Sequence, residues 1–384
     1  MFPYIFIILI LLIGAIAEVI GIKKNAKIYF VISAILVALF AGLRYNTGAD
    51  WAIYEPTFYK MPELGNIENW ELGYYLISLL IYNVFGNYYV LQFAASALLV
   101  YSVARFLWKH TDYPMFSFLL FFMIFTINML LMAQVRQSIA VAIILFGYKY
   151  ILNKSFDKFI LVIIIASFFH ISAIIVLPMY YMTKRVPNYI LILLILLFQI
   201  FYFVPEATAY IVKFFLPYMP GRLEDIGQIY IDHILFSNKV KFNTGIYYIA
   251  GVLLSVVVIF FVKNDGKEKS FLLNSLTVAM IIGALSTSMS ILDRFRPYYL
   301  IFAIATYPLI FDLKISRITS KASSLIMMLL LFCFFYIPFH GRLTFKRENS
   351  LENYKNSLNP YYNVIFHPKE AEFRKDWMQV EKKQ

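Results

Sequence analysis

The chain has 384 residues, of which 61% are hydrophobic and only 15% charged, and its mean hydropathy is +0.71. A soluble domain is about half apolar and about a quarter charged. The composition therefore excludes a soluble catalytic domain and predicts an all-α, polytopic integral membrane protein. The single cysteine, Cys333, excludes an internal disulfide and a thiolate-bound metal.

The net charge of +12 does not indicate a nucleic-acid partner. Most Lys and Arg residues lie in short connections between apolar runs, where an excess of positive charge marks the cytoplasmic side of a membrane protein. No basic stripe with interleaved aromatic residues is long enough for a nucleic-acid groove. The first apolar run, Phe2 to Gly21, lacks a basic start and a small-residue cleavage site. It is expected to be an uncleaved first span.

About 20 apolar residues cross a bilayer, whereas runs of about 10–14 are better read as re-entrant or interfacial. On this rule we expect full spans near residues 2–21, 28–43, 88–107, 114–132, 133–152, 188–204, 244–262, 270–290, 297–313 and 322–338. Two segments are ambiguous. Leu72 to Phe85 is short, and residues 159–182 contain His170 at their centre and Pro178 in their second half.

The basic loops constrain the topology, with three positive residues each in 23–27, 263–269 and 314–321. If 72–85 returns to its own side and 159–182 is a hairpin broken at His170, the other basic loops fall on the same face. The result is ten full spans and two half-spans; twelve full spans remain the alternative. Both arrangements place the two termini outside.

The predicted organisation is one transmembrane bundle over residues 1–338, with about 10–12 helices that include one or two short re-entrant or broken segments. Residues 44–70 form an outer loop, and residues 205–243 form a long outer or interfacial segment. A polar tail, 339–384, is expected outside.

The outer loop opens with Arg44, Asp50, Trp51 and Tyr54. Arg44 and Asp50 are opposite charges at the mouth of a span, and Gly48 lets the backbone bend between them. Amphipathic rings such as Trp51 and Tyr54 settle at a membrane interface or stack on a sugar. The stretch is either an anchor at headgroup level or the wall of a site.

Ionisable residues inside a bilayer are costly, at about 2.5–3.5 kcal/mol for Arg at a helix centre, and so indicate function. Arg136 and Gln137 are expected in the first turn of a helix at the outer face. There the positive helix end and a bidentate guanidinium suit a phosphate or diphosphate. His170, with Ser172 nearby, can exchange a proton with a hydroxyl group. Arg294 and Arg296, next to Asp293, form a further candidate anion site.

The chain lacks an Asp-x-Asp pair, a P-loop, a Gly-x-Ser-x-Gly motif and a dinucleotide fingerprint. We therefore expect no metal, no cofactor and no use of ATP.

Six short motifs in this order resemble the EpsG family of bacterial exopolysaccharide and O-antigen polymerases, which are Wzy-like. They are Arg44…Gly48-Ala-Asp50…Tyr54, Glu71-Leu-Gly73-Tyr74, Arg136-Gln137-Ser-Ile-Ala140, Phe169-His170-Ile-Ser172-Ala173, Asp293-Arg294 and Asn359-Pro360-Tyr361. The pattern covers roughly residues 1–365.

The resemblance implies a GT-C-like glycosyltransferase of the bacterial inner (cytoplasmic) membrane, with its active face outside. Such an enzyme joins oligosaccharide repeat units carried on undecaprenyl diphosphate. The implied partners are that lipid-linked oligosaccharide and the bilayer, with a chain-length regulator as a further candidate.

In this hypothesis His170 or Asp50 takes the proton of the acceptor hydroxyl, and Arg136 with Arg294 or Arg296 holds the lipid diphosphate. The other expected substrate-binding residues are Arg44, Gln137, Trp51, Tyr54, Glu71 and Tyr74. Three alternatives stay open: a transporter (flippase) of lipid-linked oligosaccharides, an O-antigen ligase and a membrane acyltransferase.

Overall fold

The structure, a computed structural model, describes residues 1–22, 24–48, 50–64, 70–127, 130–218, 228, 242–287, 290–312, 320–344, 358 and 361–365. The described chain is almost entirely helical, as the composition predicts. Five of its helices are long and apolar enough to cross a membrane: Phe2–Val19, Tyr88–His110, Val135–Leu152, Lys267–Ser286 and Lys321–Leu343. The protein is thus an all-α, multi-pass membrane protein. The full number of spans and the GT-C-like arrangement stay predictions.

The contacts divide the chain into two compact units, residues 1–174 with 311–384 and residues 175–310. The single bundle expected over residues 1–338 stays a prediction. Two predicted segments lie partly outside the described residues. These parts are 219–227 and 229–241 of the outer segment, and most of the tail after residue 344.

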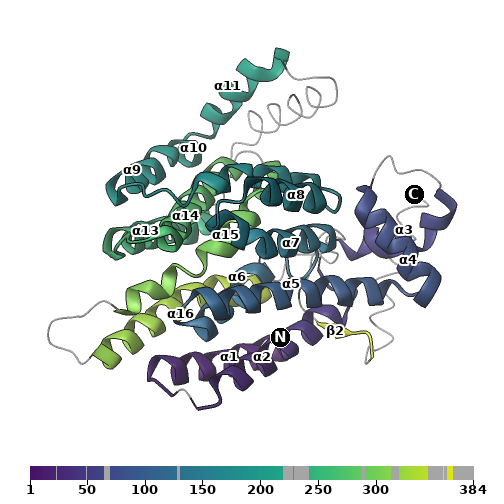
Figure 1. Ribbon diagram of the computed structural model, residues 1–384, viewed down its shortest axis with the longest axis horizontal. Coiled ribbons are helices and arrows are strands. Elements are labelled where there is room, and N and C mark those ends of the chain that lie inside the picture. Colours follow the sequence, from purple (N-terminus) through teal and green to yellow (C-terminus); the bar gives the residue numbers. More distant parts are fainter. Residues whose placement is uncertain are drawn as a thin grey trace. The chain divides into compact units, whose positions relative to one another are not determined.

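The first unit contains most of the helices and both strands (Figure 1). Its elements are α1 (Phe2–Val19), α2 (Ala26–Gly42), β1 (Arg44–Tyr45), α3 (Trp51–Leu64), α4 (Leu72–Phe85), α5 (Tyr88–His110), α6 (Pro114–Ile127), α7 (Val135–Leu152), α8 (Phe156–Ser167), α16 (Ser320–Thr344) and β2 (Tyr362–Asn363).

The boundaries between the two units fall within two 3₁₀ helices, η1 (Ile171–Tyr181) and η4 (Tyr307–Asp312). The second unit itself contains α9 (Asn188–Phe198), α10 (Ile200–Phe203), α11 (Pro205–Phe215), η2 (Leu216–Tyr218), α13 (Phe242–Phe261), α14 (Lys267–Ser286), η3 (Ser290–Arg294) and α15 (Arg296–Ala303).

Several predicted spans are shorter or divided. The run 188–204 is split into α9 and α10 at Gln199, whose side-chain amide donates to the carbonyl of Ile195 (2.9 Å). The run 297–313 is split into α15 and η4, because Pro308 has no N–H to donate and disfavours the α conformation in the residue before it. The segment 159–182 is divided at the expected place: α8 ends at Ser167 and η1 begins at Ile171.

Polar side chains satisfy helix ends inside each unit. The first four N–H groups of a helix have no partner within the helix. In the first unit the carboxylate of Glu18, on α1, accepts from the N–H groups of Met115 and Phe116 at the start of α6 (3.0 and 3.1 Å). In the second unit the Asn188 amide donates to the carbonyls of Ile259 and Val262 at the end of α13 (2.6 and 2.9 Å).

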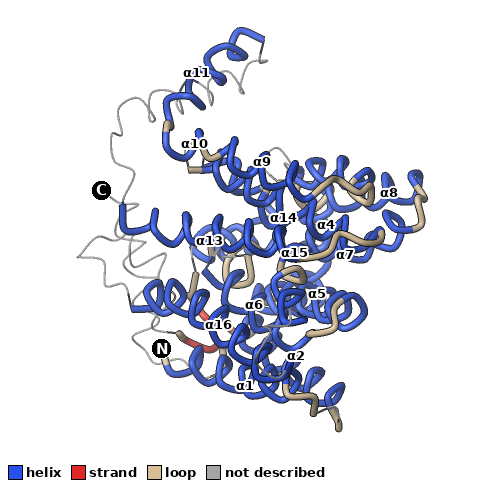
Figure 2. Tube along the Cα trace, turned by 90° about the vertical axis from the view of Figure 1, so that its left-hand side faces the viewer, coloured by secondary structure: helices blue, strands red, loops and turns tan. Residues whose placement is uncertain are grey.

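The tail returns to the start of the outer loop. Strands β1 and β2, red in Figure 2, pair antiparallel, with Arg44 opposite Asn363 and Tyr45 opposite Tyr362. The ring of Tyr361 stacks on Phe40 (centroids 4.4 Å apart), and its hydroxyl donates to the Phe40 carbonyl (2.6 Å). Residues 361–365 therefore lie at the same end of α2 as the Arg44 loop.

This pairing predicts which positions share one face of the membrane. In a Cys333→Ser background, Thr57→Cys on α3 and Ile365→Cys after β2 should react together with a membrane-impermeant maleimide in intact cells. Lys24→Cys, before α2, should show the opposite accessibility, because α2 separates it from Arg44. All three native side chains are exposed or carry exposed surface. Labelling of positions 57 and 365 from opposite faces would contradict the strand pairing.

Candidate functional site

Three separate elements of the first unit bring Glu71, Arg136 and His170 together. Glu71 directly precedes α4, Arg136 is the second residue of α7, and His170 lies in the break between α8 and η1. The break is needed for this placement, because it turns the backbone at the residue whose imidazole meets the carboxylate. α3 and α4 lie together beside the start of α5 (Figure 1).

The Glu71 carboxylate joins the other two side chains. Its Oε2 accepts from Arg136 Nη1 at 2.6 Å, and its Oε1 contacts His170 Nδ1 at 2.9 Å. The backbone N–H of Ile171 also points at Oε1, at 3.4 Å. The side chains are 15%, 24% and 10% exposed for Glu71, Arg136 and His170, so solvent reaches the cluster but does not surround it.

The protonation of the cluster follows from Glu71. Partial burial acts to raise the pKa of this carboxyl, but the hydrogen bond with His170 and the charge of Arg136 outweigh burial and lower the pKa to about 2. Glu71 is therefore ionised at neutral pH and can only accept. A neutral His170 must then carry its proton on Nδ1, which leaves the Nε2 lone pair available.

Aromatic rings enclose the guanidinium of Arg136. Its Cζ lies 4.6 Å from the centroid of Trp70 and 5.6 Å from that of Tyr54, and its Nε donates to the Tyr54 hydroxyl at 3.0 Å. Trp70 stacks on Tyr74, with centroids 5.4 Å apart. Tyr54 and Tyr74 are buried, while Trp70 is partly exposed. A cation over such rings is stabilised by the ring quadrupoles.

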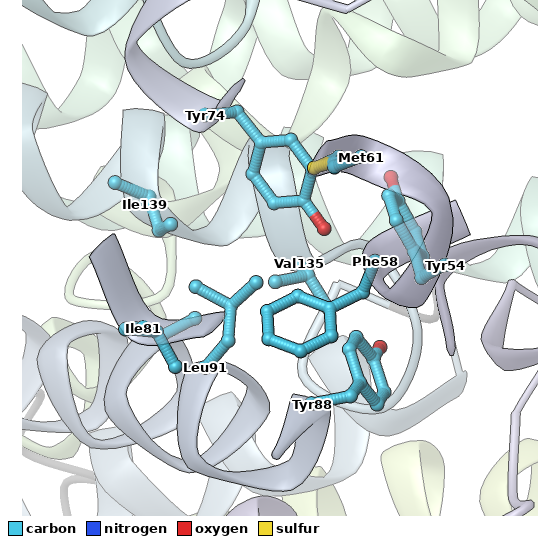
Figure 3. Close-up of a cluster of buried hydrophobic side chains, with 10 residues drawn as sticks. Tyr54, Phe58, Met61, Tyr74, Ile81, Tyr88, Leu91, Val135 and Ile139 are labelled. Atoms are coloured by element: carbon cyan, nitrogen blue, oxygen red, sulfur yellow. The ribbon is translucent and has the colours of Figure 1, made fainter. Parts of the chain in front are cut away.

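The buried tyrosines belong to a hydrophobic cluster that supports the site (Figure 3). Phe58 of α3 lies beside Leu91 and Tyr88 of α5, and this packing joins the two helices. Val135, the residue before Arg136, packs in the same cluster. The position of Arg136 is therefore determined by apolar packing as well as by its ion pair.

A backbone contact fixes the distance between Glu71 and His170. The N–H groups of Gly73 and Tyr74 both point to the carbonyl of Phe168, at 2.8 and 3.3 Å. A Cβ at position 73 would lie 2.8 Å from that carbonyl oxygen. Only glycine allows this approach without displacement.

The Arg44 side chain lies against α2 and α5 rather than in the cluster. Arg44 is 3% exposed, and its Nη1 donates to the carbonyl of Ala41 and to Ser96 Oγ (3.2 Å); its Nε has no partner among the described residues. Gly48 has a φ of +97°, and a Cβ there would lie 2.4 Å from the Met132 carbonyl oxygen. The contacts of Arg44 hold the end of α2 on α5, and its substrate role stays a prediction.

The remaining predicted residues of the first unit are placed as follows. Asp50 precedes α3 and is partly exposed, and its backbone carbonyl accepts from Ile53 and Tyr54. Trp51 is 5% exposed, and its indole N–H meets no hydrogen-bond acceptor in the part of the chain that the structure describes. Gln137 is buried beside Arg136 on α7.

Arg294 and Arg296 lie in the second unit. Arg294 is exposed at the end of η3. Arg296 begins α15 and is half-buried, and its guanidinium lies against Gly283 of α14. No described residue accepts a hydrogen bond from its Nε. Their role in holding diphosphate also stays a prediction.

Two features of the cluster were not expected from the sequence. Trp70 was not predicted, although it directly precedes the Glu71-Leu-Gly73-Tyr74 motif. Glu71 was expected to bind substrate, whereas its carboxylate joins Arg136 to His170. Among the described residues, no group of three or more His, Cys, Asp or Glu side chains is placed to hold a metal ion.

Comparison with known proteins gives one match. The model of the EpsG family matches residues 27–356, which include every residue of the cluster. No curated protein matches the chain. No solved structure matches it either.

The contact at Gly73 predicts a sharp effect of one added methyl group. Gly73→Ala should destabilise the protein by about 1–3 kcal/mol, because the Phe168 backbone must move. The readout is the thermal unfolding midpoint in detergent. Gly251→Ala is the matched control: nothing lies within 4 Å of its Cβ position on α13, so the same change should be neutral or slightly stabilising. Equal unfolding midpoints for wild type and Gly73→Ala would contradict the close backbone contact between Gly73 and Phe168.

The lowered pKa of Glu71 predicts a pH-dependent contribution to stability. Because the folded pKa lies below the unfolded one, the contribution is present above about pH 4.5 and is lost as the pH falls toward 2. Its upper limit is about 3 kcal/mol. The difference in unfolding midpoint between wild type and Glu71→Gln should therefore be largest above pH 5 and shrink at lower pH. A difference that does not change with pH would show that the charge of Glu71 is unimportant.

Proposed function

Because the chain belongs to the EpsG family, a family that indicates a membrane protein of the polysaccharide-polymerase type, we propose that it is a glycosyltransferase. It joins oligosaccharide repeat units carried on undecaprenyl diphosphate at the outer face of the bacterial cytoplasmic membrane. The observation that carries the proposal is the Glu71 carboxylate shared between His170 and Arg136. A base and a cation held together are what transfer from a diphosphate to a hydroxyl requires.

His170 acts as the general base in this proposal. The acceptor hydroxyl loses its proton to His170 Nε2 while its oxygen bonds to the anomeric carbon of the donor sugar. The imidazolium that forms remains hydrogen-bonded to the ionised Glu71 at 2.9 Å, which stabilises its charge and fixes its tautomer. The pairing favours His170 over Asp50, the other candidate.

Arg136 stabilises the leaving group. The bond between the anomeric carbon and the diphosphate breaks, and the electron pair leaves with the lipid diphosphate. Among the described residues, Tyr54 accepts from Nε of Arg136 and Glu71 accepts from Nη1, so both N–H groups of Nη2 and the second N–H of Nη1 are left to donate to phosphate oxygens. The start of α7 adds the positive end of a helix dipole at the same point. Arg294 or Arg296 remains the candidate for the second lipid diphosphate.

The rival functions make different demands. A flippase needs cations but gives His170 no proton to transfer. A membrane acyltransferase also uses a histidine, and it would alter acetyl content while sparing chain length. An O-antigen ligase has the closest chemistry, and its loss leaves long polymer unattached to its final acceptor. A strain without this protein should accumulate single lipid-linked repeats in the outer leaflet; accumulation in the inner leaflet would indicate a flippase.

Arg136→Ala and His170→Ala should each abolish long chains while single repeats remain on the lipid. Removal of a general base typically lowers a rate by about 10²–10⁴-fold. Chain length is read from gels of the polysaccharide, and the repeats from extracted lipid. Arg136→Lys keeps the charge but loses the fork that meets both Tyr54 and Glu71, so it should restore little.

The control for these variants is Lys60→Ala, on the exposed side of α3. It removes a charge from the same region without touching the cluster and should leave chain length unchanged. Wild-type chain lengths in both the Arg136 and His170 variants would overturn the proposal.

A further inference from the structure

A groove of about 470 Å³ lies between α2 and α5, away from the catalytic cluster. These two helices pack side by side in the first unit. Small side chains, including Ala34 and Ala38 of α2 and Ala97 of α5, line the groove and leave room between the helices. The groove runs along α2 from Lys27 to Leu39, about 18 Å at 1.5 Å per residue. One leaflet of a bilayer has a hydrocarbon thickness of about 15 Å.

The two ends of the groove differ in charge. At the end marked by the first turn of α2, the lining includes Lys27, Arg105 and Lys109, all exposed. Over the rest of its length the lining is almost wholly apolar, and none of the described residues that line it is acidic. This end is opposite to the Arg44 end of α2, which lies near the start of α5.

Among the described residues that line this groove, three are cationic and none is acidic; Glu18 and Asp112 line a neighbouring cavity that Lys27 also borders. Arg105 and Lys109 are four residues apart on α5, a spacing that brings like charges together on one helix face at a small cost in stability. Lys27 adds a third charge from α2. Trp108 lies between the two α5 cations in sequence and lines the same groove. Its ring packs on that of Phe30, with centroids 5.3 Å apart. Tryptophan is enriched where hydrocarbon meets headgroups.

We propose that this groove binds an anionic glycerophospholipid. One acyl chain lies along the apolar lining between α2 and α5, and the phosphate is held by Lys27, Arg105 and Lys109. A zwitterionic lipid fits the groove equally well by shape but brings its own ammonium group toward three cations. The site therefore selects for net negative charge on the headgroup, a selection that basic pockets between transmembrane helices make. This binding does not depend on the proposed reaction at His170.

The test uses the full-length protein in detergent and native mass spectrometry with phosphatidylglycerol or phosphatidylcholine of identical acyl chains. Wild type should retain phosphatidylglycerol in preference to phosphatidylcholine. Each cation contributes about fivefold in binding to an anionic lipid. The triple variant Lys27→Gln/Arg105→Gln/Lys109→Gln should thus lose up to about 100-fold in phosphatidylglycerol affinity and lose the preference. If the triple variant does not fold, the single variant Lys27→Gln tests the proposal, and its affinity for phosphatidylglycerol should fall about fivefold.

Two further variants separate charge from shape. Lys60→Gln/Lys158→Gln/Lys263→Gln changes the net charge equally at exposed positions outside the groove lining, so it should bind like wild type. Ala34→Phe/Ala97→Phe fills the groove and should weaken both lipids without changing the charge.

Three results would overturn the proposal. Equal retention of phosphatidylglycerol by wild type and the Lys27/Arg105/Lys109 variant would remove the role of the cations. Equal affinity of wild type for the two phospholipids would remove the headgroup selection. Displacement of phosphatidylglycerol by an equimolar amount of undecaprenyl phosphate would identify the occupant as a carrier lipid instead.

Discussion

The pair of charge-assisted hydrogen bonds accepted by Glu71 is the interaction on which the rest of the cluster depends. One carboxylate links the residue before α4, the start of α7 and the break after α8. Without it, Arg136 would be a largely enclosed cation with only a phenol and aromatic rings as partners, and the His170 imidazole would be free to rotate. Removal of one partner of such a pair typically costs more than the pair itself contributes. The site is therefore organised as a unit.

That unit requires an irregular scaffold. α4 has only 14 residues, about 21 Å of helix, which is short for a full crossing. Its start is hydrogen-bonded to the Phe168 carbonyl in the break between α8 and η1. Non-helical backbone at membrane depth is tolerated where protein or a watery cavity surrounds it. Protein covers the break between α8 and η1, because its Phe168 carbonyl accepts from the start of α4 and its His170 side chain meets Glu71. The hydrophobic cluster that contains Phe58 also includes Tyr74 of α4 and Val135 of α7.

Hydropathy and helix-breaking residues predicted the helical class, the bounds of α4 and the break at His170. The sequence also predicted that Arg136 lies at the start of a helix, because a charged residue begins an apolar run there. The link from Glu71 to His170 joins residues 99 positions apart, and no local periodicity reports such a distance. Arg44 illustrates the same limit: the sequence places it at the mouth of a span, but its burial and its contacts with Ala41 and Ser96 could not be read from the sequence. Contacts between residues distant in sequence determine both the Glu71–His170 hydrogen bond and the burial of Arg44.

The short β1–β2 ladder has a consequence for the order of assembly. Arg44 and Tyr45 are made early, but their strand partners, Asn363 and Tyr362, follow every helix that the structure describes. Until those partners arrive, the Leu43 carbonyl, which accepts from Val364 at 2.8 Å, and the face of Phe40 under Tyr361 stay uncovered. Such a long-range closure comes late because it must wait for the intervening chain. Residues 361–365 can thus complete the loop that α2 begins only after the intervening helices have been synthesised.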